Sequence, residues 1–312
     1  MRHRRVGASG LRVSSLGLGT WMWGTHVDGE VARDLLRLFL DAGGTLLDTA
    51  HSYGDGASET QLGSLLGDDV SRDEVVLATK AGLTHTPAGR VVDTSRRALL
   101  RELDRSLGRL GTDHVDLWMP HGWSDAVPLD ETLGALEYAV SSGRARYVGV
   151  SNYAGWQAAR AFSLLEAARV PLVATQVEYS LVARRAEDEV LPAARALGMG
   201  VLAYSPLGGG VLTGKYRSGV PSDSRAAMRE FPGFVTGRLD AHGMAVTEAV
   251  TTAARGLQVT PTEVALAWVR DRPGVTSAVL GSRTVPQLRT ALASEALELP
   301  TAIVEALDEV SE

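Results

Sequence analysis

The feature that most constrains the fold of this 312-residue chain is the alternation of short apolar runs with longer helical patterns. Eight runs have the length and composition of buried strands. They are Ser15–Gly19, Thr45–Asp48, Val75–Thr79, Val115–Met119, Ala145–Val150, Leu172–Val177, Gly200–Tyr204 and Ser277–Leu280. Strands that alternate with helices form parallel β/α folds, so we expect one closed (β/α)8 TIM barrel over residues 1–312.

The helical segments show apolar residues at spacings of three and four. The clearest is Thr94–Arg109, with Asp93 as a possible N-cap. Others are predicted at Glu30–Ala42, Glu59–Leu66, Leu129–Val140, Tyr153–Ala168, Glu187–Leu197, Met244–Gly256 and Thr262–Arg270, with one starting near Val285 and a C-terminal helix after it. An N-terminal β-hairpin is expected from Arg4–Gly7 and Leu11–Val13, around a turn at residues 8–10.

One long stretch, from Gly208 to Gly243, has no periodicity and is rich in Gly, Pro and Ser. Loops of this length in compact domains are usually functional. An open, doubly wound sheet is the alternative to a barrel. It would require a glycine-rich phosphate loop after the first strand, and Gly17-Leu18-Gly19 lacks the third glycine.

Composition excludes several classes of function. The net charge of −6 argues against nucleic acid or an anionic membrane as the main partner. There are no cysteines, which excludes disulfides and thiolate chemistry and suits a cytoplasmic protein. No apolar stretch has the length of a membrane span. A monomer is the default expectation.

Polar side chains follow the ends of three predicted strands. Asp48 ends one strand and Tyr53 follows on the next loop, while Lys80 and His121 come after two others. The carboxyl ends of barrel strands meet on one face, where catalysis occurs. A phenol titrates near 10, so we expect a lysine ammonium, held by Asp48, to lower the pKa of Tyr53 toward the working range of an acid.

The chain resembles the aldo-keto reductase family over essentially its whole length. The matching strings are Gly17-Leu18-Gly19-Thr20, Asp48–Gly54, Ala78-Thr79-Lys80, Gly149–Tyr153, Gln176–Ser180, Tyr204–Gly208 and Gly281-Ser282-Arg283 with Gln287-Leu288. The resemblance implies catalysis by Asp48, Tyr53, Lys80 and His121, and NADPH as the hydride source. Around His121 the sequence departs from the family, because Met119-Pro120 precedes it and Gly122-Trp123 follows.

The resemblance also implies a set of cofactor-binding residues. They are Gly19, Thr20, Trp21, Asp48, Ser151, Asn152, Gln176, Tyr204, Ser205, Pro206, Leu207, Gly208, Gly210, Leu212, Gly214, Lys215, Gly281, Ser282, Arg283 and Gln287. Ser282 and Arg283 would hold the 2′-phosphate. The family usually continues with a Glu-Asn pair that contacts adenine, where this chain has Thr290 and Ala291.

The substrate is expected to be a small carbonyl compound that is apolar or sugar-like, with Trp21, Trp23 and Trp123 lining its pocket. Some relatives in the family are nucleotide-sensing regulatory subunits, and an intact set of catalytic residues is compatible with that role. A metal-dependent hydrolase on the same barrel is not supported, because the seven histidines form no His-x-His or His-Glu-x-x-His pattern.

Overall fold

The structure is a computed structural model that describes residues 1–67, 70–86, 89–228 and 235–312. All eight predicted strands are present in it. They are β3 (Leu16–Gly19), β4 (Leu46–Asp48), β5 (Val76–Ala81), β8 (Val115–Pro120), β9 (Ala145–Ser151), β10 (Leu172–Glu178), β11 (Gly200–Tyr204) and β12 (Val275–Leu280). These strands pair in parallel and close into a barrel in the order β3-β4-β5-β8-β9-β10-β11-β12. The prediction of a (β/α)8 barrel is confirmed.

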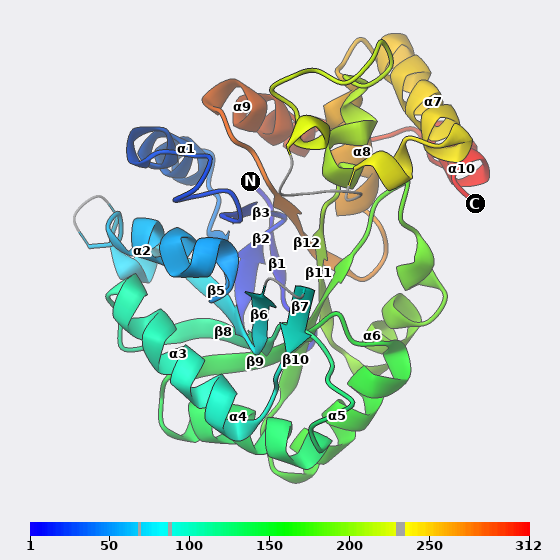
Figure 1. The fold of residues 1–312 in the computed structure, drawn as a ribbon. Coiled ribbons are helices and arrows are strands. Elements are labelled where there is room, and N and C mark those ends of the chain that lie inside the picture. The colour runs from blue at the N-terminus through cyan, green and yellow to red at the C-terminus, as the bar shows by residue number, and fades with distance from the viewer. Residues whose placement is uncertain (68–69, 87–88, 229–234) are drawn as a thin grey trace.

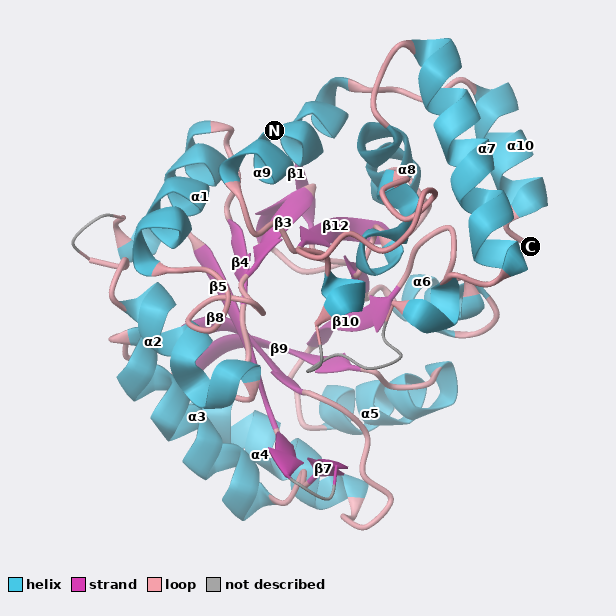
Figure 2. Cartoon of the chain, turned by 45° about the horizontal axis from the view of Figure 1, so that its top comes forward, coloured by secondary structure: helices cyan, strands magenta, loops and turns pink. Residues whose placement is uncertain are grey.

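Helices surround the barrel (Figures 1 and 2). They are α1 (Gly29–Asp41), α2 (Ala57–Gly63), α3 (Arg96–Leu110), α4 (Leu129–Ser141), α5 (Gly155–Ala167), α6 (Val190–Leu197), α7 (Ala241–Leu257), α8 (Pro261–Arg270), α9 (Val285–Ala293) and α10 (Thr301–Val310). The expected cap of α3 is corrected: Ser95 is the N-cap and accepts from the amide of Ala98, while Asp93 accepts from the amide of Ser95.

The N-terminal hairpin closes the bottom of the barrel. Its strands are β1 (His3–Arg5) and β2 (Arg12–Ser14). Apolar residues from the hairpin and its turn form one buried cluster with side chains that fill the barrel interior. The members of this cluster are Val6, Leu11, Val13, Leu46, Ala78, Leu117, Met119, Val173, Ala174, Leu202 and Val279. The hairpin therefore seals the amino ends of the strands and leaves the carboxyl ends accessible.

A second hairpin was not anticipated from the sequence. Strands β6 (Leu83–Thr86) and β7 (Gly89–Val92) follow β5 and form an antiparallel pair outside the barrel sheet (Figure 1). The long loop between β11 and the last helices is present as predicted, with short 3-10 turns at Gly208–Thr213, Arg225–Ala227 and Thr236–Arg238. Residues 229–234 of this loop lie outside the described part of the chain. No helix among the described residues is long and apolar enough to cross a membrane.

The contact between the N-terminal hairpin and β11 can be tested by substitution. A Cβ at Gly200 would lie 2.6 Å from Thr276 Oγ1 and 2.7 Å from the backbone nitrogen of Gly7. We expect Gly200→Ala to lower the free energy of unfolding by about 1–3 kcal/mol, since the backbone of the hairpin must move. Denaturant unfolding measures this effect.

Gly256→Ala in α7 is the matched control, because no atom lies within 4 Å of the added Cβ. It should stabilise the protein by about 0.5–1 kcal/mol, as alanine does in a helix. Equal effects of the two substitutions would contradict this account of the barrel floor.

Candidate active site

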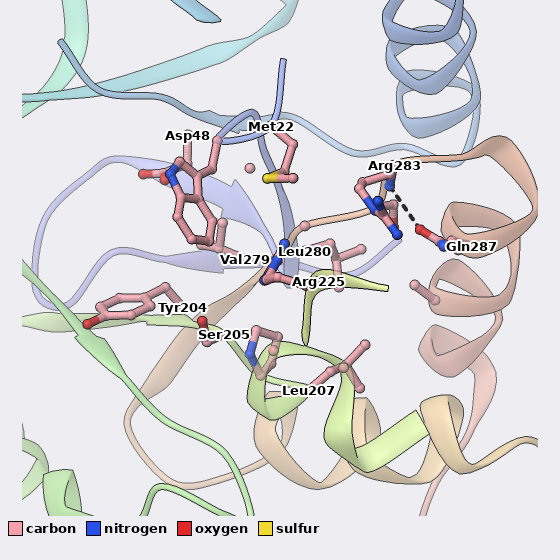
Figure 3. Close-up of a pocket in the computed structure, with 18 of the residues that line it drawn as sticks. Met22, Asp48, Tyr204, Ser205, Leu207, Arg225, Val279, Leu280, Arg283 and Gln287 are labelled. Carbon is pink, nitrogen blue, oxygen red and sulfur yellow. Dashed lines mark hydrogen bonds between the residues drawn. The ribbon is translucent and has the colours of Figure 1, made fainter. Parts of the chain in front are cut away.

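A cavity of about 560 Å³ opens at the carboxyl ends of the barrel strands. The last residues of β3, β4, β11 and β12 line it, together with Gln176 of β10. The long loop after β11 and residues of α9 form the opposite wall (Figure 3). The fold therefore brings the polar residues that follow separate strands into one site.

A buried ion pair lies beneath the cavity. The Lys80 amine donates to both carboxylate oxygens of Asp48, each at 2.8 Å, and to the carbonyl oxygen of Thr49 at 2.7 Å. The Lys80 side chain is fully buried, and burial lowers its pKa while Asp48 opposes that effect. Gln176 donates to Asp48 Oδ1 at 2.7 Å and fixes the carboxylate from β10.

Tyr53 lies above this pair, on the 3-10 turn that follows β4. The Lys80 amine is 5.3 Å from the centre of the Tyr53 ring. Burial raises the pKa of the Tyr53 phenol well above 10, and the negative charge of Asp48 adds to this effect. This direction is opposite to the sequence expectation that Lys80 lowers the pKa of Tyr53, because burial and the charge of Asp48 dominate.

His121 packs edge-on against Tyr53, with ring centres 5.8 Å apart. Burial lowers its pKa well below 6.5, and the positive charge of Lys80 lowers it further, so the imidazole is neutral. Its Nδ1 lies 3.3 Å from the Ser52 hydroxyl. In the tautomer that accepts from Ser52, the proton is on Nε2 and available as a donor.

A second buried polar network supports the Asp48–Gly54 loop. Arg109 of α3 donates to Nδ1 of His51 and to Glu59 Oε2, both at 3.1 Å. The other Glu59 oxygen accepts from Thr79 of β5 at 2.7 Å. The sequence does not reveal this network, because its members lie on separate elements with no spacing that links them.

Asn152 ties two strand ends together across the cavity. Its amide nitrogen donates to the carbonyl oxygen of His121 at 3.1 Å, and its side-chain oxygen accepts from the Tyr204 hydroxyl at 2.9 Å. Burial raises the pKa of Tyr204 to about 12, so this phenol remains a donor. Asn152 adopts a left-handed φ of 58°, which asparagine tolerates better than most residues.

Three cations line the part of the cavity formed by the segments that follow β11 and β12. Lys215 and Arg225 come from the loop after β11, and Arg283 follows β12. Figure 3 shows the Arg225 side chain between Tyr204 on one side and Arg283 on the other. Burial and the neighbouring Arg283 lower the pKa of Arg225 to about 10. A Cβ at Gly210 would lie 3.0 Å from the Lys215 amine, so glycine there leaves room for the cation.

This part of the cavity is suited to an anionic ligand. The amino terminus of α9 follows Arg283, and helix amino termini favour anions. The backbone nitrogen of Arg283 donates to Gln287 Oε1 at 2.9 Å, and its guanidinium donates to the carbonyl oxygen of Asp223 at 2.6 Å. The only carboxylate among the described lining residues is Asp48, which is already paired with Lys80.

Most of the residues predicted to bind the cofactor line this cavity. They are Gly19, Trp21, Asp48, Asn152, Gln176, Tyr204, Ser205, Pro206, Leu207, Gly210, Lys215, Gly281, Ser282, Arg283 and Gln287. Thr290 and Ala291, which depart from the family pattern, also line it. Arg225, His85 and Arg90 also line the cavity and were not predicted, because they come from segments without a recognised motif.

Five predicted cofactor residues do not line the cavity: Thr20, Ser151, Gly208, Leu212 and Gly214. Thr20 and Ser151 are fully buried, and their hydroxyls bond to Ser58 and Asn152, respectively. These two side chains support the cavity wall from behind.

The tryptophans differ in position. Trp21 lines the cavity, and its ring centre is 6.4 Å from that of Tyr53. Trp23 is fully buried in the hydrophobic core and Trp123 packs against Tyr153 and Trp156, so neither is among the lining residues. The expectation that Trp23 and Trp123 line the substrate pocket is corrected by this placement. The described residues contain no cluster of three or more His, Asp or Glu that could hold a metal ion.

Residues 15–312 match the aldo/keto reductase family. The chain belongs to this family. It is 35% identical to the L-glyceraldehyde 3-phosphate reductase of Escherichia coli (strain K12), over 92% of this chain and 86% of the relative. It is 36% identical to the uncharacterized oxidoreductase YrpG of Bacillus subtilis (strain 168), over 99% of this chain and 96% of the relative. These relationships support an oxidoreductase that acts on carbonyl compounds.

The contact between His51 and Arg109 predicts a pH dependence of stability. Burial and the positive charge of Arg109 lower the pKa of His51 from 6.5 to about 4. The unfolded chain therefore binds this proton more readily, so stability is lost as the pH falls from 6.5 toward 4. The loss is at most about 1.4 kcal/mol per pH unit for one proton.

We expect His51→Gln to flatten this dependence, since glutamine can accept from Arg109 without binding a proton. Denaturant unfolding across this pH range measures the slope. His242→Gln, at an exposed position on α7, is the control and should keep the wild-type slope. A slope unchanged by His51→Gln would show that His51 is not the responsible group.

Proposed function

We propose that this protein reduces an aldehyde or ketone to an alcohol with NADPH as the reductant. The observation that carries the proposal is the arrangement of Tyr53, a neutral phenol, beside the neutral His121 and above the Asp48–Lys80 pair. The same cavity is also lined by cations. Family membership supports the reaction class.

The cofactor supplies a hydride, which no side chain can provide. Lys215, Arg225 and Arg283 would face its phosphates, and Gln176 and Asn152 line the cavity near the catalytic residues. Trp21 and Tyr204 offer aromatic surfaces in the same cavity. Arg283 and Ser282 would distinguish NADPH from NADH through the 2′-phosphate.

Tyr53 acts as the general acid in this proposal. A reduced carbonyl oxygen becomes an alkoxide, which is a much stronger base than a phenolate, so a phenol with a raised pKa still gives up its proton. Once Tyr53 is ionised, the Lys80 charge near its ring stabilises the phenolate. His121 donates a hydrogen bond that orients the carbonyl oxygen. Asp48 and Gln176 hold Lys80 in position.

A nucleotide-sensing regulatory subunit with little turnover is the alternative function. The two are distinguished by NADPH oxidation with a panel of aldehydes. Rates far above background support the enzyme, and tight NADPH binding without turnover supports the alternative. The name of the Escherichia coli relative makes glyceraldehyde 3-phosphate a first substrate to try.

Removing the Tyr53 hydroxyl should abolish the chemistry and leave the cofactor bound. General acid catalysis contributes about 10² to 10⁴ in rate, so we expect Tyr53→Phe to lower kcat by at least that factor. Steady-state kinetics and NADPH titration measure the two effects. Tyr138→Phe, which removes an exposed phenol on α4, is the control. Near-wild-type turnover by Tyr53→Phe would exclude Tyr53 as the acid.

Arg283 should set the cofactor preference. A hydrogen bond to a charged group contributes about 1.5–3 kcal/mol, so Arg283→Ala should weaken NADPH binding about 10- to 150-fold and leave NADH binding nearly unchanged. Arg289→Ala, an exposed arginine on α9 outside the cavity, is the matched control. Equal losses for the two cofactors in Arg283→Ala would refute the assignment.

A further inference from the structure

The hairpin β6–β7 directs two basic side chains into the mouth of the cavity. His85 and Arg90 are opposite each other in its register, and Leu83 is opposite Val92. Alternate residues of a strand share a face, so all four side chains lie on one face of the hairpin. Leu83 is buried and lines the cavity, and His85 and Arg90 line it too. This face is therefore turned toward the site.

Arg90 lies at the catalytic end of the cavity. A Cβ at Gly122, the residue after His121, would be 3.4 Å from a guanidinium nitrogen of Arg90. Burial is the main cause of the lowered pKa of His121 and of the raised pKa of Tyr204; the positive charge of Arg90 adds to the first effect and opposes the second. Lys215, Arg225 and Arg283 come from the loops after β11 and β12, and the Arg225 guanidinium carbon lies 4.9 Å from the centre of the Trp21 ring.

The Arg90 charge has no counterion in the described part of the chain, where Arg90 forms no hydrogen bond or ion pair. Asp48 is the one carboxylate among the described residues that line the cavity, and it is bound by Lys80 and Gln176. The cations from the loops after β11 and β12 would be used by the cofactor phosphates. The Arg90 charge would then lie beside the reacting carbonyl without being used by the cofactor.

We propose that Arg90, with His85 opposite it, binds an anionic group of the substrate, so that the preferred substrates are short aldehydes or ketones bearing a phosphate or a carboxylate. A guanidinium can bind either group through two parallel hydrogen bonds. This inference rests on the proposed function, because it assigns the part of the substrate that does not react. The position of Arg90 on an exposed hairpin leaves its side chain able to adjust to substrates of different length.

The test measures matched charged and neutral substrates with the wild-type enzyme and with Arg90→Gln. The phosphate pair is glyceraldehyde 3-phosphate and glyceraldehyde, and the carboxylate pair is succinic semialdehyde and butanal. In each case the preference is the ratio of kcat/KM for the charged member to that for the neutral one. We expect Arg90→Gln to lower the preference about 10- to 150-fold for the anion that the site accepts. The pair that responds identifies phosphate or carboxylate.

Arg97→Gln is the charge-matched control. Arg97 is exposed on α3 and is not among the lining residues, so its substitution should leave the preference unchanged. The inference is overturned if the wild-type enzyme prefers neither charged substrate, or if Arg90→Gln has the same preference as wild type. Aldehyde reduction itself would still stand in either case.

A binding measurement separates this inference from the proposed function. Calorimetry with glycerol 3-phosphate, with glycerol as the neutral reference and with and without NADP⁺, requires no turnover. We expect the wild-type protein to bind glycerol 3-phosphate. Arg90→Gln should weaken this binding at least about tenfold, and Arg97→Gln should leave it unchanged. If the wild-type protein binds glycerol 3-phosphate in this way but reduces no aldehyde, the proposed function is wrong and the anion site stands. Equal binding by wild type and Arg90→Gln would remove the anion site.

Discussion

The buried ion pair between Asp48 and Lys80 is the constraint on which the site depends. A charge fully removed from water is costly unless it is paired and hydrogen-bonded, and here every Lys80 proton has an acceptor. The pair joins the end of β4 to β5, and Gln176 extends it across the barrel to β10. Tyr53 is thereby held over a fixed charge arrangement that is neutral overall.

Charge is divided along the cavity in a way that matches the proposed chemistry. The catalytic end holds neutral Tyr53 and His121 over a compensated pair, while cations line the end assigned to the cofactor. The hairpin β6–β7 adds Arg90 at the catalytic side. A barrel whose floor is filled by apolar side chains and the N-terminal hairpin keeps water from reaching the pair from below.

Hydrophobic periodicity was sufficient to predict the barrel, because each strand is a short apolar run and each helix has a continuous apolar face. Because Asp48, Lys80 and His121 stand at or just after the ends of predicted strands, their position at the carboxyl face of the barrel could also be predicted. The hairpin β6–β7 was missed, since Leu83–Thr86 is largely polar and exposed, and so was Arg225, which lies in an aperiodic loop. Trp23 was misplaced because a loop position near the catalytic face does not determine which way a side chain turns. The pKa of Tyr53 is raised by burial and by the charge of Asp48, and sequence spacing shows neither effect.

The central claim is that Asp48 compensates Lys80, so that Tyr53 is a neutral phenol before the reaction. A spectrophotometric pH titration of phenolate absorbance, taken as the difference between wild type and Tyr53→Phe in the absence of cofactor, tests it directly. The account predicts that Tyr53 ionises only above its ordinary value of about 10. A Tyr53 phenolate that forms below that value would contradict the account, because it would show that the Lys80 charge acts on Tyr53 uncompensated.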